Sequence, residues 1–226
     1  MDQPSIYIKG DPDQQATADS VLFSFKKSDK TVETYDLNVV IYTTGVVSEY
    51  PRTFDLEVVS SGTNVTSDDY SIGKMELLAG AYYATVPITV NRTVGGLDLT
   101  QEIATLTLRV KANENFEVGA EEYMQFKLCW CDYLIQPAWW TLYGFTFDAG
   151  PFTQARYQFI LDYYGDVDLF EMGIVDPITG YAADYNKQYA FIAELIELLN
   201  EYNATHEEPY LNDNGEPLEF GSGLTY

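Results

Sequence analysis

The sequence is poor in the residues that carry most covalent and metal chemistry. Its 226 residues include two cysteines, Cys129 and Cys131, and one histidine, His206, in a polar C-terminal stretch. A hydroxyl or thiol nucleophile usually needs a nearby base such as histidine, and a structural zinc site needs four nitrogen or sulfur ligands. The sequence therefore predicts no catalytic residues, no metal site, no cofactor and no enzymatic activity. With 35 Asp and Glu, a glycosidase-like pair of carboxylates stays open as an alternative.

Basic residues are also scarce. Lys and Arg number 12 against 35 Asp and Glu, so the formal net charge is -23. A field of this sign repels phosphate backbones and anionic lipid head groups. Nucleic acid is thus excluded as a partner, and so is a membrane contact made through the protein surface. Neutral ligands such as sugars are not repelled.

Long hydrophobic runs are missing too. No segment approaches the roughly 20 apolar residues that a transmembrane helix needs. The start at Met1 and Asp2 has neither a basic region nor an apolar region of a signal peptide. Two expectations follow: a cytosolic protein, or a secreted one whose leader has been removed.

The two cysteines are separated by Trp130. On a strand, residues i and i+2 lie on one face, with Cα atoms roughly 6.5–7 Å apart, at or beyond the limit for a disulfide. We predict that Cys129 and Cys131 remain unbonded and face the core as small hydrophobic residues.

Apolar and aromatic residues are plentiful, at 46% and 15% of the chain, with 19 Tyr. Seven segments show the alternation or β-branched content of strands, with turn residues between them. Such spacing is typical of a sandwich or barrel. The predicted strands cover residues 20–25, 35–42, 53–59, 72–78, 82–90, 103–110 and 123–131.

The pattern changes beyond Pro137. Apolar residues spaced as on helices follow Thr153 and Asp184, and they predict helices near residues 153–164 and 184–202. The second helix carries a stripe comprising Tyr185, Tyr189, Ile192, Leu195, Ile196, Leu199 and Tyr202. Two helices form a small core, so we expect a sandwich at 1–132 and a helical appendage with a C-terminal tail, 133–226, packed on it.

Several stretches, in order, resemble a family of surface lipoproteins of unknown function from the Bacteroidetes, encoded beside SusC/SusD-type glycan importers. The most specific are the Pro-Ala-Trp-Trp block at 137–140, the helix entry at 150–156 and the Asn-Gly-Glu-Pro tail at 214–217. Shorter matches lie at 24–25, 37–42, 45, 51–54, 69–70, 79–80, 90–93, 115–119 and 132–134.

The resemblance implies a mostly-β fold, an Ig-like or fibronectin-like antiparallel β-sandwich with a small C-terminal helical appendage. It also implies an outer-membrane lipoprotein on the cell surface, with a supporting role in glycan capture and with glycan or SusC/SusD-type proteins as partners. Membrane attachment would then depend on a lipidated cysteine encoded shortly before Asp2. The family carries no established catalytic residues.

Trp139, Trp140 and Tyr143 form the predicted ligand-binding site. Adjacent residues of an extended segment point to opposite sides, so one Trp ring would be buried and the other would find either the helices or solvent. An exposed ring could stack on a neutral sugar. The alternative is that both rings join the appendage to the sandwich.

For the other candidate site residues, a structural role is an alternative to the functional one. Arg52 and Arg92 could clamp a carboxylate or sulfate, or pair with nearby acids such as Glu49 or Asp55. Acidic stretches at 11–13, 68–69, 166–168 and 212–215 could bind calcium, or serve turns and caps. Asp19-Ser20-Val21 resembles a Bacteroidetes O-glycosylation acceptor, or begins a strand.

Two functions from different classes follow. The first is an accessory protein of a glycan import system that binds glycan through exposed aromatic residues. The second is a structural or adhesion module that docks to other surface proteins through a sheet edge or helix face. An exposed Trp flanked by polar side chains favours the first, and a broad apolar patch without a cleft favours the second.

Overall fold

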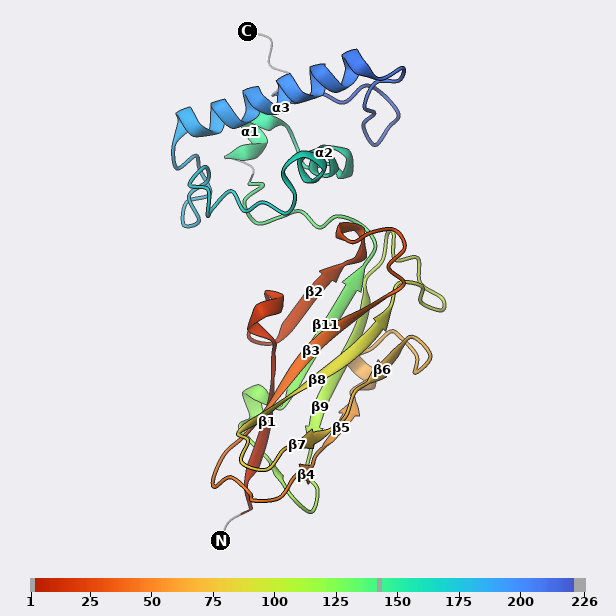
Figure 1. The fold of residues 1–226 in the computed structure, drawn as a ribbon, viewed down its shortest axis with the longest axis vertical. Helices are drawn as coiled ribbons and strands as arrows, with labels where there is room; N and C mark the ends of the chain where they lie inside the picture. Colours follow the sequence, from red (N-terminus) through yellow and green to blue (C-terminus); the bar gives the residue numbers. More distant parts are fainter. Residues whose placement is uncertain (1–2, 142–143, 222–226) are drawn as a thin grey trace. The chain divides into compact units, whose positions relative to one another are not determined.

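The computed structural model describes residues 3–141 and 144–221 (Figure 1). The chain divides into two compact units, Met1–Tyr133 and Leu134–Tyr226. The first unit is built from strands, and the helices of the second lie in the C-terminal part of the chain.

The first unit is a β-sandwich. One sheet has the strand order β10-β1-β3-β8-β6, the other has the order β2-β11-β9-β5, and β4 pairs with β7 in a short ribbon. The strands are β1 (Ser5–Gly10), β2 (Ser20–Ser24), β3 (Thr34–Thr43), β4 (Arg52–Thr53), β5 (Asp55–Val58), β6 (Tyr70–Ile72), β7 (Glu76–Leu77), β8 (Tyr83–Asn91), β9 (Ala104–Lys111), β10 (Glu117–Val118) and β11 (Gln125–Cys131).

Alternation along the strands forms the sandwich core. In β8, Val86, Ile88 and Val90 are fully buried, and the residues between them are not. Because side chains alternate between the two faces of a strand, every second residue enters the space between the sheets. Trp130 of β11 is buried there and donates its indole N–H to the carbonyl oxygen of Asn91, at 3.0 Å. The large apolar side chains of both sheets therefore share one core.

The predicted fold class is confirmed, and all seven predicted strand segments contain strands. Two of the eight pairings in the described residues, β1 with β10 and β2 with β11, are parallel, which differs from a wholly antiparallel sandwich. Strands joined by a short turn must run antiparallel, but β2 and β11 are distant in sequence and are free of that rule. Strand β1 was not predicted, although its buried residues Ile6 and Ile8 alternate with less buried ones.

The cysteines differ from expectation in one respect. Both are free thiols, as predicted. However, Phe126, Leu128 and Trp130 point into the core, so Cys129 and Cys131 lie on the opposite face of β11. Cys131 is nevertheless buried, and desolvation raises the pKa of both thiols. The prediction that they face the core was wrong. Phe126, Leu128 and Trp130 occupy the inward positions of β11, so the cysteines in the alternate positions point outward.

Asp69 is a buried carboxylate that anchors two loops. It accepts hydrogen bonds from the backbone N–H of Gly95 at 3.0 Å, and from the N–H and hydroxyl of Thr66 at 2.7 and 2.8 Å. Burial raises the pKa of Asp69, but these hydrogen bonds outweigh it and hold the pKa below its usual value. The charged form is thus favoured by the folded state.

Asp69 should contribute to the acid sensitivity of the fold. A carboxyl whose pKa is depressed on folding stabilises the protein above its unfolded pKa, and this contribution is lost as pH falls through the folded pKa. We expect Asp69→Asn to lower the free energy of unfolding at neutral pH by about 1–3 kcal/mol, the cost of leaving a buried donor unpaired. The variant should also lose less stability on acidification, as measured by urea unfolding.

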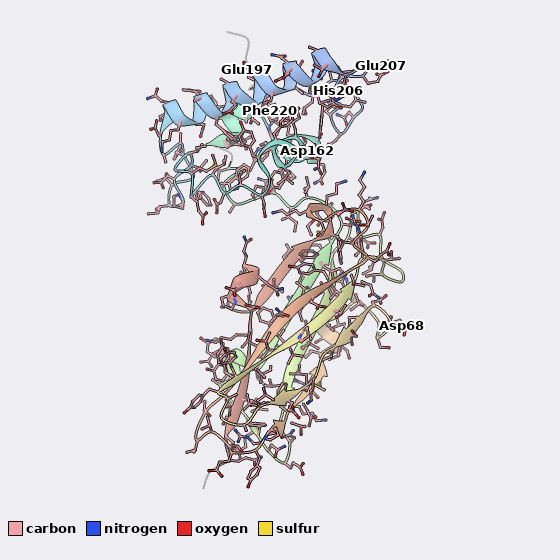
Figure 2. The ribbon with its side chains drawn as sticks, in the orientation of Figure 1. Asp68, Asp162, Glu197, His206, Glu207 and Phe220 are labelled. Atoms are coloured by element: carbon pink, nitrogen blue, oxygen red, sulfur yellow. The ribbon has the colours of Figure 1, made fainter. Side chains whose placement is uncertain are left out.

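Asp68 is the matched control for this experiment, because it is the exposed neighbour of Asp69 (Figure 2). Asp68→Asn should leave both the neutral stability and the acid slope unchanged. If Asp69→Asn unfolds with the same pH dependence as the wild-type protein, the proposed role of this carboxylate is wrong.

In its described residues, the second unit contains three helices, α1 (Phe145–Ala149), α2 (Gln154–Tyr164) and α3 (Tyr185–Thr205). The Thr153 hydroxyl caps α2, and the Asp184 carboxylate accepts hydrogen bonds from two N–H groups at the start of α3. Unpaired N–H groups at a helix start favour such residues. Both predicted helices are confirmed, and α1 is a single short turn of helix that periodicity does not reveal.

The buried face of α3 is narrower than the predicted stripe. Tyr185, Tyr189 and Ile196 are exposed, contrary to expectation. The helix buries Gln188, Phe191, Ile192, Leu195 and Leu199, which follow the spacing i, i+3, i+4, i+7 and i+11. The three exposed residues are rotated away from that line, so they flank the buried face.

The second unit has a hydrophobic cluster of its own, which includes Trp139, Trp140, Phe145, Tyr157, Phe159, Leu195 and Phe220. Packing of the appendage on the sandwich stays a prediction. Among the described residues, no helix combines the length and apolar character that a bilayer crossing requires.

Candidate functional site

Trp139 and Trp140, two of the predicted ligand-binding residues, are buried in the second unit. Their exposed fractions are 3% and 1%. The two rings stack on each other with centroids 5.5 Å apart and planes 20° apart, and the edge of Phe145 meets both. Tyr143, the third predicted residue, lies outside the described residues. Neither indole offers a face to solvent here.

The expectation that adjacent Trp rings must diverge was wrong. The backbone N–H of Trp140 donates to the carbonyl oxygen of Pro137 at 2.9 Å, so the segment is a turn and not an extended strand. A turn rotates successive side chains out of the strict alternation of a strand. The Trp140 indole N–H donates to the carbonyl oxygen of Gly150 at 3.1 Å, which satisfies its polar atom inside the core.

Replacing Trp140 should loosen the second unit. Trp140→Ala removes a fully buried ring and leaves a cavity, at a cost of about 3–5 kcal/mol. We expect faster hydrogen exchange of the α2 and α3 amides, with the sandwich strands unchanged, measured by mass spectrometry. Tyr189→Ala, on the exposed face of α3, is the control and should leave exchange unaltered. Unchanged exchange in Trp140→Ala would contradict this role of the ring.

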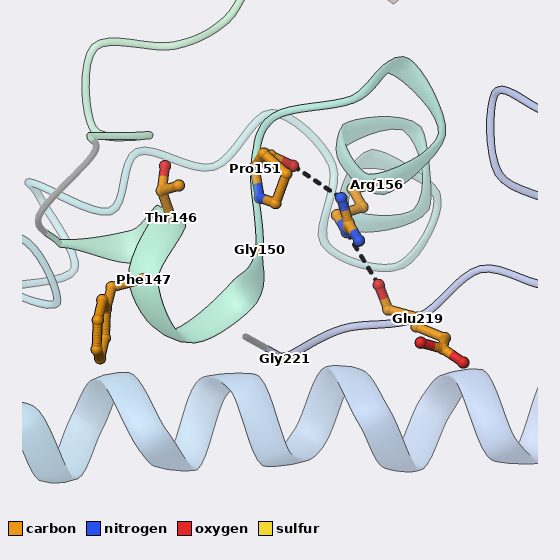
Figure 3. Close-up of a pocket in the computed structure, with 7 residues that line it drawn as sticks. All are labelled: Thr146, Phe147, Gly150, Pro151, Arg156, Glu219 and Gly221. Atoms are coloured by element: carbon orange, nitrogen blue, oxygen red, sulfur yellow. Dashed lines mark hydrogen bonds between the residues drawn. The ribbon is translucent and has the colours of Figure 1, made fainter. Parts of the chain in front are cut away.

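Arg156 borders a pocket of about 360 Å³ in the second unit. Its Nε donates to the carbonyl oxygen of Glu219 and its Nη1 to that of Pro151, both at 2.9 Å (Figure 3). Desolvation lowers the pKa of this guanidinium, whereas the charges of Asp213 and Glu219 act in the opposite direction. Arg156 thereby holds the start of α2 against the chain near its C-terminal end, which is a structural task.

The two arginines selected from the sequence behave differently. Arg92 forms a two-pronged ion pair with Asp132, with both N···O distances at 2.8 Å, which supports the structural interpretation. Arg52 lies over the Phe116 ring, 4.6 Å from its centroid, and its Nε and Nη2 are buried without a hydrogen-bond partner in the described part of the chain. The expected partners Glu49 and Asp55 are not paired with it there.

The acidic loops perform turn and cap duty. Asp11 caps a 3-10 turn, Asp168 accepts from the N–H of Phe170, and Asn212 accepts from two backbone N–H groups of its own loop. Within residues 3–141 and 144–221, no group of three or more His, Cys, Asp and Glu is arranged to hold a metal ion. Ser20 begins β2, and its hydroxyl bonds to Asp19 at 3.1 Å.

His206 lies at the C-terminal end of α3, beside Glu207 (Figure 2). Its ring stacks on Tyr202, with centroids 3.8 Å apart, and its Nδ1 lies 2.9 Å from the Tyr202 carbonyl oxygen. These contacts hold the imidazole against its own helix. The Thr205 hydroxyl lies 3.1 Å from the same Nδ1 and also 3.1 Å from the Tyr202 carbonyl oxygen, so it is engaged with the end of the same helix.

A row of three tyrosines crosses the outer face of the five-stranded sheet. Tyr7 of β1 pairs in register with Tyr42 of β3, and Tyr42 pairs with Tyr83 of β8. The rings of Tyr7 and Tyr42 are stacked, with centroids 5.3 Å apart and planes 13° apart. Those of Tyr42 and Tyr83 are 5.9 Å apart and tilted by 38°. We call Tyr7, Tyr42 and Tyr83 the tyrosine row.

The two ends of the tyrosine row differ. At the β1 end, Tyr123 lies 6.1 Å from the Tyr7 ring, and the Lys9 ammonium is 4.4 Å from the Tyr123 centroid and 5.6 Å from that of Tyr7. A cation over aromatic faces at such distances is attracted to them. At the β8 end, Tyr83 is 59% exposed, and β6 pairs with β8 only from Ile88 onward.

Charge beside the tyrosine row is concentrated at its β1 end. Lys9 lies two residues along β1 from Tyr7 on the same outer face, and the exposed Glu117 of β10 is in register with Ser5. Along β3 and β8, the outer-face positions two residues from Tyr42 and Tyr83 are the uncharged Val40 and Thr85. Phenol hydroxyls and threonine offer donors and acceptors without a net charge.

Sequence reasoning did not identify this row, although part of its signal was present. Tyr42 and Tyr83 fall within predicted strands, at positions opposite in parity to the buried Ile41 and Val86. That parity alone puts both rings on the outer face. Tyr7 lies in the strand that was missed, and the register that aligns the three rings is a long-range property.

Residues 1–166 match the family described as Domain of unknown function (DUF4843), and the chain belongs to this family. The match continues beyond the sandwich to the end of α2. The expected relationship to a family of unknown function is confirmed at this level. No curated protein matches the chain.

Several solved structures are similar to part of the chain. A provisionally assigned carbohydrate binding protein from Bacteroides ovatus has 8% identity and a TM-score of 0.41, with 57% of this chain and 37% of that one covered. A Bacteroides ovatus protein of unknown function has 18% identity and a TM-score of 0.39, covering 55% and 43%. The apo CBD1 domain of Calx has 14% identity and a TM-score of 0.37, covering 58% and 98%.

This chain thus spans well under two thirds of the two Bacteroides proteins. TM-scores this low do not support an inference about the ligand or activity of this chain. The candidate site therefore depends on the geometry of the tyrosine row itself.

Proposed function

We propose that this chain is a non-catalytic binding module that captures neutral glycan at the bacterial cell surface, as an accessory to a glycan import system. The observation that carries the proposal is the tyrosine row on the outer face of the five-stranded sheet. Tyrosine joins an apolar ring to a polar hydroxyl, the combination that a sugar's apolar faces and hydroxyl rim require.

The net charge of the chain favours a neutral ligand over an anionic one. The chain has a net charge of -23, which repels anionic polymers, whereas a neutral sugar needs no countercharge. Val40 and Thr85, the outer-face neighbours of Tyr42 and Tyr83 in β3 and β8, are uncharged, and Lys9 at the β1 end is already engaged with the Tyr7 and Tyr123 rings. Stacking and hydrogen bonding to hydroxyl groups are the interactions that this surface offers.

The surface location and the lipid anchor are part of the proposal. They come from the resemblance of residues 137–140, 150–156 and 214–217 to Bacteroidetes surface lipoproteins encoded beside SusC/SusD-type importers. We propose that a lipidated cysteine precedes Asp2 in the full-length gene and that such importers are partners. The protein would then hold glycan near the importer without cleaving it.

A second candidate function is docking to another surface protein through the helical unit. The observation that favours it is the exposed flank of α3, where Tyr185, Tyr189 and Ile196 face solvent. Exposed apolar side chains that recur along a helix are typical of an interaction face. This function would leave glycan binding absent or unconnected to the tyrosine row.

Affinity electrophoresis through gels that contain neutral polysaccharides tests the proposed function. We expect at least one polysaccharide to retard the wild-type chain, with little dependence on salt because no ion pair is involved. The double variant Tyr42→Ser/Tyr83→Ser should lose most of the retardation, at least about tenfold in affinity. The matched control is Tyr185→Ser/Tyr189→Ser, which removes two exposed tyrosines from the other unit.

Retardation of the wild-type chain by none of the polysaccharides would contradict the proposed function. Equal retardation of the Tyr42/Tyr83 double variant would assign binding to another surface. Loss of binding in the Tyr185/Tyr189 variant alone would favour the helical unit as the contact region.

A further inference from the structure

The spacing within the tyrosine row leaves no room for a ligand between its rings. A sugar ring inserted between two aromatic faces needs a plane separation of about 7–8 Å, twice the optimal carbon contact of 3.5–4.0 Å. The centroids of Tyr7 and Tyr42 are 5.3 Å apart, and those of Tyr42 and Tyr83 are 5.9 Å apart. Each of these faces is therefore covered by its neighbour in the row.

One end of the row is also closed. Tyr123 and the Lys9 ammonium lie against Tyr7, so the protein itself supplies the contacts at that end. Tyr83 is at the other end and is 59% exposed. On this edge of β8, strand β6 pairs from Ile88 onward and the Gly73 N–H donates to the carbonyl oxygen of Pro87, so within the described residues no strand pairs with this edge at Tyr83. The Tyr83 ring therefore presents the row's open face.

We infer that the proposed site takes one sugar ring per module, stacked on the outer face of Tyr83, from a soluble or single-chain neutral glycan. This inference rests on the proposed function and adds the class of glycan. Binding to the flat surface of a packed, insoluble polysaccharide requires several aromatic faces turned outward together. In the tyrosine row the rings face one another. Their edges and hydroxyl groups are therefore turned outward from the sheet, and the one ring face left open is that of Tyr83.

The remaining rings have a supporting role in this arrangement. Tyr42 packs against the inner side of Tyr83 and limits its rotation, which reduces the side-chain entropy lost on binding. Thr85 lies two residues along β8 on the same face and is exposed. Its hydroxyl and that of Tyr83 are available to the hydroxyl groups of the bound ring.

Titration calorimetry with soluble neutral oligosaccharides of increasing length tests this inference, using the glycan that retards the full chain. Affinity should become constant, within about twofold, once the stacked ring is present, and the same glycan in insoluble packed form should not be bound. Tyr83→Ala should weaken binding about tenfold or more, and Tyr83→Trp should keep it. The melting temperature should fall by at most a few degrees, because Tyr83→Ala removes one cross-strand ring contact and creates no cavity in the core.

The matched control is Tyr82→Ala. Tyr82 is 58% exposed and adjacent in sequence, but it is not a member of the row. Its replacement should leave affinity unchanged. Lys9→Gln should also leave affinity unchanged, because it alters the closed end.

Three results would overturn the inference while the proposed function stands. They are equal binding by Tyr83→Ala, affinity that rises steadily with chain length, and binding of the packed polymer. Retardation of the wild-type chain by no neutral glycan would remove the proposed function and this inference together.

Discussion

The register between β1, β3 and β8 determines both faces of the five-stranded sheet. Because side chains alternate with a period of two, a slip of one residue would exchange the buried and the exposed set of a whole strand. The observed register pairs Ile8 with Ile41 inside the sandwich and Tyr7 with Tyr42 outside. The same hydrogen bonds that assemble the core thus place the tyrosines side by side. The candidate site is a consequence of folding and needs no separate loop to form it.

The apolar pattern predicted most of the strands but not their partners. Segments such as residues 103–110 alternate strongly, and a strand lies there whatever its neighbours are. Pairing of β2 with β11 depends on residues more than 100 positions apart, as in Val21 opposite Leu128, and local pattern contains no such information. For the same reason the alignment of Tyr7, Tyr42 and Tyr83 was beyond sequence reasoning, although the outward parity of Tyr42 and Tyr83 was within it.

The Trp139–Trp140 pair shows why composition is a poor guide to a binding site. Tryptophan is prominent in recognition, but it also has the largest apolar area to bury. A turn at Pro137 directs both rings into the core of the second unit, and the indole N–H of Trp140 finds a carbonyl partner there. The aromatic residues that remain at the surface of the sheet are tyrosines, whose hydroxyl makes exposure less costly.

An aromatic row of this kind can serve a structural role and a binding role together, because the two use different ring faces. The inner contacts between Tyr7, Tyr42 and Tyr83 add cross-strand packing of about 0.2–1 kcal/mol per pair. They would exist whether or not a ligand binds. The outer face of Tyr83 has no such partner from within the described sandwich, and its exposure leaves apolar area in contact with water. A ligand that covers this face recovers hydrophobic free energy without disturbing any contact that the fold already makes.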